Sequence, residues 1–458
     1  MKHKRLWIFL PLLSLVAAAL GCNLPSQTQP TAEPTVSDAA VATRVAKTMQ
    51  AHGGEATATP EKVVTATQVS DVEPVPTEAP EVLRVAFSDA NRDLWVWQQG
   101  SVPVKRIDSG DIVDVKISPD GDQLLFARSA DFSAYSLWVL PFSGGSEREL
   151  VSAADFESMK GFADAITAQP FVYGWVPATE QIYFVTSPVF EGPGLVVNDD
   201  LWLVDAASGS RRALLRAGEG GLPYFAPDGE TVMISTAENI VLMNADGSGR
   251  EVVKEFEPVL TYSEYMYYPS VQWRSDSSLA GAAIPPRDPL ASPTGDTWVG
   301  FLSDEAQLIK NVSAHFLSAA VFNQQLDKFV YLKNVGAAGE NRSELRVVRD
   351  LSAAALTDEV FVTGNLEFLS WAPDGVRFAY QDRGTGKTML GQVEAGRMEL
   401  TGVQDPIGLA WIDDSNLLYL SRTAESWKMY TVKIGESPVE VAELGPADAY
   451  FPSYSFVK

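Results

Sequence analysis

The sequence predicts an all-β fold, a β-propeller of four-stranded antiparallel blades, and three observations predict it. Short apolar segments with alternating hydrophobicity follow one another from about residue 83 to the last residue. A turn such as Trp-Ala-Pro-Asp-Gly at 371–375 separates two such segments, and Pro, Asp and Gly each favour turn geometry. Variants of this turn recur at intervals of about 40 to 58 residues, which is the spacing of propeller blades with loop insertions.

The first element of each unit is an apolar strand that ends in this turn, and the second is an apolar strand that follows it. The turn variants lie at 117–121, 175–179, 225–229, 273–277, 371–375 and 411–415. A degenerate copy, Phe-Asn-Gln-Gln at 322–325, lacks both Pro and Gly. A third strand follows, often with Trp or Tyr at its centre, and a short hairpin such as 244–249 leads to a fourth.

This repeat resembles that of the TolB-like, WD40-like (PD40 repeat) β-propeller family. Those repeats carry a Trp-Ser-Pro-Asp-Gly turn, an apolar strand, a Leu-Trp/Tyr-Val strand and an Asp-Gly hairpin. The resemblance covers the chain from about 83 to its end and implies the propeller fold, but propellers host many activities. TolB proteins are periplasmic interaction proteins with an extra N-terminal α/β domain, six blades and no lipobox, so their role is not carried over.

The blade count follows from the repeats and from two incomplete pieces. Full units begin near 112, 171, 222, 270, 318, 367 and 407. Residues 83–107 form a blade without its first strand, and residues 451–457 form a first strand without its blade. Their pairing completes a further blade and leaves no open sheet edge. We therefore predict eight blades, with seven as the alternative if the degenerate unit at 319–332 is absorbed.

Two N-terminal segments, which differ in composition from the propeller and from each other, precede it in the sequence. Residues 1–22 combine a basic start, an apolar stretch and Ala-Leu-Gly-Cys at 19–22, which resembles a bacterial lipoprotein lipobox. The resemblance implies lipid attachment at Cys22 and a location on the outer side of the bacterial cell membrane, at the cell surface or in the periplasm; the alternative is an ordinary signal peptide. Residues 23–80, rich in Thr, Pro and Ala, predict a disordered stalk, and residues 81–458 predict the propeller domain.

Composition excludes several function classes. The formal net charge of −24 argues against nucleic acid and anionic lipid surfaces as partners. Cys22 is the only cysteine, so no intrachain disulfide forms, and His315 is the only histidine of the predicted domain. A Ser-His-Asp triad needs an imidazole, and neither a Gly-x-Ser-x-Gly elbow nor zinc-ligand spacing occurs. Residues 89–93 resemble a calcium loop without its glycine and distal Glu, so we expect a hairpin turn, no metal and no cofactor.

Insertions predict which face of the propeller binds. The connections between strands two and three and the connections between blades emerge on the same face of the propeller. We place nearly all long insertions in these connections. Long loops are often functional, so this face is favoured as the binding surface. The insertions lie at 128–136, 151–170, 186–200, 254–269, 284–296, 333–343 and 356–366. Within 153–169, Phe156, Met159, Phe162, Ala163 and Ile166 recur at helical spacing, which predicts a short amphipathic helix as a structural cap.

The aromatic loop at 262–269 is the main candidate site on this face, because Tyr and Met are enriched at recognition surfaces. The alternative is that these tyrosines fill the gap between adjacent blades. The candidate binding residues are Tyr262, Tyr265, Tyr267, Tyr268, Phe190 and Arg287.

Two functions compete at this point. The leading hypothesis is a non-catalytic module, anchored to the membrane by its N-terminal lipid, that binds a protein, peptide or glycan through the face with the insertions. The alternative is an enzyme of the polysaccharide lyase or glycosidase type with its site at the central channel and with residues such as Arg287 and Asp288 from the insertions.

Overall fold

The computed structural model describes residues 82–458, apart from 192–195, 264, 291–295, 304, 315–319, 338–339 and 354. The predicted signal peptide, Cys22, the predicted stalk and His315 lie outside the described residues. Among the residues described, no helix is both long and apolar enough to cross a membrane.

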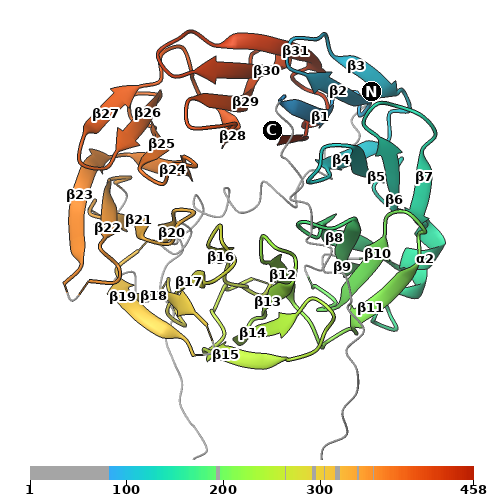
Figure 1. Ribbon diagram of the computed structural model, residues 1–458, viewed down its shortest axis with the longest axis horizontal. Coiled ribbons are helices and arrows are strands. Elements are labelled where there is room, and N and C mark those ends of the chain that lie inside the picture. The colour runs from blue at the N-terminus through green and yellow to red at the C-terminus, as the bar shows by residue number, and fades with distance from the viewer. Residues whose placement is uncertain are drawn as a thin grey trace, which may run out of the picture. The chain divides into compact units, whose positions relative to one another are not determined.

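The described chain forms eight four-stranded antiparallel sheets around a central opening, each with its first strand innermost (Figure 1). This confirms the predicted all-β, eight-bladed propeller. Two blades are β4 (Ile112–Ile117), β5 (Gln123–Arg128), β6 (Ser136–Pro141), β7 (Arg148–Val151) and β8 (Thr167–Trp175), β9 (Gln181–Val189), β10 (Leu201–Asp205), β11 (Arg211–Leu215). The next two are β12 (Leu222–Phe225), β13 (Thr231–Ser235), β14 (Asn239–Asn244), β15 (Glu251–Glu255) and β16 (Val271–Trp273), β17 (Ala280–Ile284), β18 (Thr297–Leu302), β19 (Gln307–Val312).

The second half of the ring repeats the same order. Two further blades are β20 (Val321–Phe322), β21 (Lys328–Asn334), β22 (Ser343–Arg349), β23 (Thr357–Gly364) and β24 (Leu366–Trp371), β25 (Arg377–Asp382), β26 (Lys387–Gln392), β27 (Gly396–Glu399). The seventh is β28 (Ile407–Trp411), β29 (Asn416–Arg422), β30 (Ser426–Lys433), β31 (Val439–Pro446), and the closing blade is β32 (Tyr454–Val457), β1 (Arg84–Ser88), β2 (Leu94–Gln98), β3 (Val104–Ile107).

The closing blade joins the two ends of the domain, as predicted. β32 pairs antiparallel with β1, with Arg84 opposite Val457 and Phe87 opposite Tyr454. The sheet order β3-β2-β1-β32 makes the C-terminal strand the inner strand of a blade that the N-terminal residues supply. The pairing gives β1 a neighbour on each side, so β1 is not left as an open edge, and β32 takes the inner position that the first strand holds in the other blades.

The degenerate repeat forms a true blade, which excludes the seven-blade alternative. Its inner strand β20 has only two residues, but it pairs with β21 in a four-stranded sheet. Asn323 and Gln325 replace the missing Pro and Gly by bonding the neighbouring turn: Asn323 Nδ2 donates to the Gly375 carbonyl (3.0 Å) and Gln325 Nε2 to the Pro373 carbonyl (3.2 Å). The turn therefore gains contacts between blades in place of intrinsic turn propensity.

Two local predictions were wrong. The helix α2 covers only Ala153–Ser158, where a Ser152–Asp155 capping box begins it and Phe156 is buried. Gly161 has φ +70°, a left-handed conformation that a helix does not continue through, and Phe162 and Ile166 are exposed instead of covering the ring. Residues 356–366 are not an insertion, because Thr357–Gly364 is β23, the fourth strand of its blade.

The apolar core lies between neighbouring blades. One cluster combines Leu125 and Leu137 of one blade with Ile182 and Phe184 of the next, and all four are fully buried. Each such side chain contributes roughly 1.5–3 kcal/mol when it leaves water. The core therefore fixes the scaffold and leaves the connections on each face free to vary.

Candidate binding surface

A pocket of about 460 Å³ opens among four connections of the face that carries the insertions. We call it the Tyr268 pocket. Its lining residues are Gly161, Phe162, Val196, Val197, Asn198, Asp199, Ala217, Gly218, Met266 and Tyr268. They come from the β7–β8, β9–β10, β11–β12 and β15–β16 connections, three of which link one blade to the next.

A buried hydrogen-bond network holds one wall of the pocket. The Asp200 carboxylate accepts from the Thr186 backbone N–H (2.8 Å) and the Thr186 hydroxyl (2.7 Å). It also accepts from the indole N–H of Trp202 (2.8 Å), which anchors the carboxylate to β10. Asn198 Nδ2 donates to Thr186 Oγ1 (2.7 Å) and to the Met159 carbonyl (3.0 Å), so the same network holds the segment after α2. Burial raises the pKa of Asp200 despite these donors.

Asp199 and Tyr268 connect the pocket wall to the aromatic loop. The Tyr268 hydroxyl donates to Asp199 Oδ1 at 2.9 Å. Burial raises the pKa of the Asp199 carboxyl, and the neighbouring Asp200 charge adds to this, while the Tyr268 bond opposes it. Burial and the Asp199 charge also raise the pKa of Tyr268. Asp199 has φ +50°, and the Gly220 N–H donates to its carbonyl (2.6 Å), which holds its left-handed backbone conformation.

The structure separates the six predicted binding residues into two groups. Tyr268 lines the pocket, and Phe190 packs edge-on against the pocket residue Phe162 with ring centroids 6.0 Å apart. Tyr262 is 65% exposed and its hydroxyl donates to Asp288 Oδ2 (2.6 Å), away from the pocket lining. The remaining three lie outside the lining: half-buried Tyr265, half-buried Tyr267 and exposed Arg287, which faces Glu257 at 3.6 Å.

Tyr267 is half-buried, and burial raises the pKa of its phenol to about 12. Sequence reasoning missed Asn198 and Asp199. The sequence feature that could have indicated them is the run Asn-Asp-Asp at 198–200, directly before the apolar strand Leu-Trp-Leu. Carboxylates that a buried strand draws out of water need hydrogen-bond partners.

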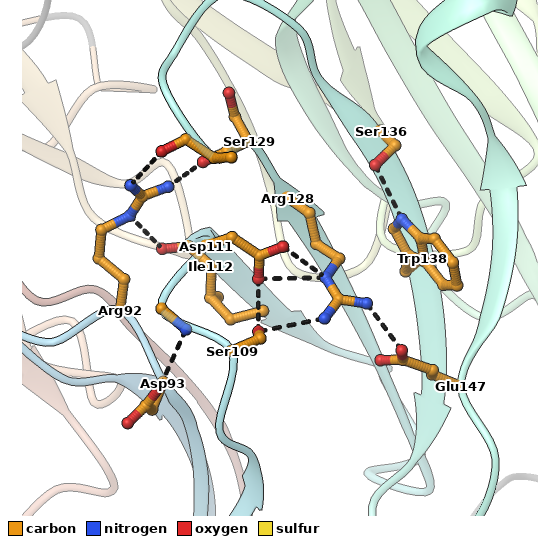
Figure 2. Close-up of polar contacts among 12 residues, drawn as sticks. Arg92, Asp93, Ser109, Asp111, Ile112, Arg128, Ser129, Ser136, Trp138 and Glu147 are labelled. Atoms are coloured by element: carbon orange, nitrogen blue, oxygen red, sulfur yellow. Dashed lines mark hydrogen bonds and ion pairs between the residues drawn. The ribbon is translucent and has the colours of Figure 1, made fainter.

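A second polar network lies on the same face, between the closing blade and its neighbour (Figure 2). The Arg92 guanidinium donates to the carbonyls of Ala130 (3.2 Å) and Ser129, and it stacks on the Phe132 ring at 4.4 Å. Arg128 bridges Asp111 (3.1 Å) and Glu147 (2.7 Å) beneath it, as Figure 2 shows. All of these donors are used within the protein, so the network holds loops in place and offers no free cation.

Residues 89–93 form the expected hairpin turn. Asp89 Oδ1 accepts from the backbone N–H groups of Asn91 (2.9 Å) and Asp93 (3.0 Å), and Asp89 Oδ2 accepts from the Trp95 indole (2.9 Å). The carboxylate is therefore engaged by its own turn. Across the described residues, no group of three or more His, Cys, Asp and Glu side chains has the arrangement of a metal site.

The inner strands carry few polar side chains that are not already paired. Asp114 and Lys116 of β4 form an ion pair (2.9 Å). The Asp114 carboxylate also accepts a hydrogen bond from the hydroxyl of Tyr173 on β8 (3.1 Å). Elsewhere on the ring, Glu367 of β24 pairs with Arg383, which lies in the β25–β26 connection of the same blade. The inner strands β4 and β8 thus bring together an ion pair and one tyrosine, and Gln272 of β16 and Glu367 of β24 line a shared pocket of about 560 Å³. Arg287 and Asp288 are engaged at the face, with Glu257 and Tyr262.

Comparisons with known proteins identify the fold. No protein-family model and no curated protein matches the chain. Among solved structures, TolB from Acinetobacter baumannii is 14% identical with a TM-score of 0.31 and aligns over 58% of this chain and 61% of its own. A prolyl endopeptidase is 14% identical with a TM-score of 0.49, over 73% of this chain and 50% of its own. This chain thus spans less than two thirds of either neighbour's length.

A eukaryotic initiation factor structure is 8% identical with a TM-score of 0.51, over 82% of this chain and 98% of its own. At this identity the likeness concerns the fold alone. The class of the protein is an eight-bladed β-propeller, and its structural neighbours include TolB and the propellers of peptidases.

Proposed function

We propose that this protein is a non-catalytic binding module that recognises a protein, peptide or glycan through the face with the insertions. We further propose that a lipid group on Cys22 anchors it on the outer side of the bacterial cell membrane, with residues 23–80 as a stalk. The lipobox-like Ala-Leu-Gly-Cys at 19–22 supports the anchor, and a predicted stalk without aromatic residues supports a displayed domain.

The Tyr268 pocket is the observation that carries the proposal. Its volume of about 460 Å³, its apolar walls and its few convergent polar groups match the usual size and composition of a ligand site. Phe162 and Met266 remain 41% and 56% exposed at its rim, although both are apolar. Exposed apolar side chains beside a concave site favour recognition of a partner.

Peptide and glycan arrays probed with the purified protein test this function, and a turnover assay on every hit separates binding from catalysis. We expect saturable binding without turnover. A Met266→Ala and Phe162→Ala double variant should lose the hits, because it removes exposed rim side chains. The matched control is Val102→Ala with Val439→Ala, which removes two exposed apolar side chains on the opposite side of the blades.

Binding that survives the rim variant, or turnover of a bound glycan, contradicts the proposal. The anchor is tested separately by metabolic labelling with a palmitate analogue: the wild-type chain should incorporate the label, and Cys22→Ser should not.

A further inference from the structure

The side chain of Asn198 leaves one buried acceptor without a partner. Its Nδ2 group must face the Met159 carbonyl, which only accepts, and the Thr186 hydroxyl, whose hydrogen is donated to Asp200. The orientation of the amide is therefore fixed, and Oδ1 is the atom that remains. Asn198 is only 3% exposed, and Oδ1 has no hydrogen-bond partner among the described residues. A buried acceptor in this state costs free energy until a donor reaches it.

Gly161 lies directly against this oxygen. A β-carbon at Gly161 would lie 2.6 Å from Asn198 Oδ1, so any larger residue would collide with the oxygen. Both residues line the Tyr268 pocket. Glycine at this position therefore lets its segment pack directly against the oxygen, which lies in the wall of the pocket beside Asp199.

The other polar groups of the pocket are also acceptors. Asp199 presents a carboxylate whose hydrogen bond within the described residues is the one from Tyr268. The lining residues that the structure describes include no Lys, Arg or His, so none of the described cations lines the pocket. Burial raises the pKa of Asp199, which indicates that its charge lacks compensation.

The walls suit an apolar stem beneath a charged head. Phe162, Val196 and Met266 present exposed carbon surface at the rim, and Phe190 holds the Phe162 ring edge-on. The Tyr268 ring lies in the same lining, and an aromatic face attracts a nearby cation. The formal net charge of −24 adds a long-range attraction for cations.

We propose that the Tyr268 pocket binds a primary alkylammonium group, with the Asp199 carboxylate accepting its N–H bonds and the rim covering its methylene stem. This inference rests on the proposed binding function of the face and names the ligand chemistry for it. Two sources supply such a group: the side chain of a lysine in a polypeptide, and a free diamine.

Isothermal titration of the full chain with three probes tests the proposal. The probes are the peptide acetyl-Gly-Leu-Lys-Leu-Gly-amide, the same peptide with norleucine for lysine, and 1,5-diaminopentane. We expect the lysine peptide to bind about tenfold or more tightly than the norleucine peptide, because charge-assisted hydrogen bonds are the strong ones. A peptide that binds more tightly than the diamine indicates a polypeptide source, and the reverse order indicates a free amine.

The variant Asp199→Asn keeps the side-chain shape and the acceptor for Tyr268 but removes the charge. It should therefore lower the affinity for the lysine peptide about tenfold. Glu238→Gln is the matched control: it removes one exposed negative charge from the same face, outside the pocket lining, and should leave binding unchanged. A thermal midpoint equal to that of the wild type shows that the Asp199→Asn protein is folded.

Equal binding of the lysine and norleucine peptides, or full affinity in Asp199→Asn, overturns the proposal. So does the absence of amine binding. If array hits without amines still depend on Phe162 and Met266, the binding function stands and only the ligand chemistry fails; if no array ligand binds, both fail.

Discussion

Phe87 of β1 lies directly opposite Tyr454 of β32 in the antiparallel ladder of the closing blade. The contact joins residues from the two ends of the domain. Ser453 strengthens it, because its backbone N–H and hydroxyl both bond the Ser88 hydroxyl at 3.0 Å. The Tyr454 hydroxyl also donates to the Gly408 carbonyl of the seventh blade, so the last strand holds the closing blade to its neighbour as well.

Deletion of residues 450–458 should therefore lower the thermal midpoint sharply, by about 10 °C or more, since it removes an entire inner strand and exposes an unpaired edge. Differential scanning calorimetry measures the change. The control is Lys458→Ala, which removes one terminal ion pair and keeps the strand. An unchanged midpoint in the truncated protein would contradict the closure scheme.

The Pro-Asp-Gly turn at 373–375 gives a second prediction. Gly375 has φ +65°, and a β-carbon there would lie 1.9 Å from Gln325 Oε1 and 2.7 Å from Asn323 Nδ2. Gly386 has φ +70° but open space around it. Gly386→Ala should cost about 1 kcal/mol from backbone strain alone, whereas Gly375→Ala should cost about 3 kcal/mol or more, because it also separates two blades.

Urea unfolding of both variants measures this difference, and the excess loss in Gly375→Ala reports the contact between blades. A double variant with Gln325→Ala should recover part of the excess, since the clashing side chain is then absent. Equal losses at the two glycines would show that the turn makes no such contact.

The scaffold was predictable because each blade repeats the same local chemistry. Alternating apolar strands and Pro-Asp-Gly turns act within a few residues, so the eight blades and the closure follow from sequence. The blade at 321–364 was the hardest to predict, since its turn replaces local propensity with Asn323 and Gln325 bonds to another repeat. Such a contact depends on residues about fifty positions away and has no local signal.

The pocket was predictable only in part for the same reason. Tyr268 and Phe190 stood out as aromatic residues in long loops, and one lines the pocket while the other packs on its wall. Asn198 and Asp199 acquire their roles from four connections that converge in space. The helix in 153–169 was predicted too long, because helical spacing of apolar residues continued past Gly161, where the backbone turns left-handed.

The buried network behind the pocket gives a third prediction. Asp200→Ala should destabilise the protein by about 3 kcal/mol, because it leaves the Thr186 N–H and the Trp202 indole without an acceptor in a buried place. The control is Asp131→Ala in an exposed loop, where only Ser133 is bonded, and it should cost less than about 1 kcal/mol. Urea unfolding followed by tryptophan fluorescence measures both; similar losses would contradict a structural role for Asp200.

Acid should weaken the contact between the last residue and the seventh blade. Burial opposes ionisation of Asp413, but the Lys458 ammonium, the Ser415 N–H and the Asn416 amide outweigh it and lower the pKa of Asp413 to about 2, from an ordinary value of 3.8. A carboxyl with a lowered folded-state pKa stabilises the protein above its unfolded pKa, and that stability is lost as the pH falls through the folded value. The relevant window is therefore between about pH 4 and pH 2.

Lys458→Ala should accordingly lower the free energy of unfolding at pH 6 by up to about 1 kcal/mol, the usual size of a partly exposed ion pair. The difference from the wild type should shrink as the pH falls below about 4 and approach zero only below about pH 2, where Asp413 becomes protonated even in the wild type. Urea midpoints at pH 6, 4 and 2.5 measure it. High salt at pH 6 should reduce the same difference by screening. A loss that is independent of pH would assign the effect of Lys458 to packing of its methylene stem rather than to its charge.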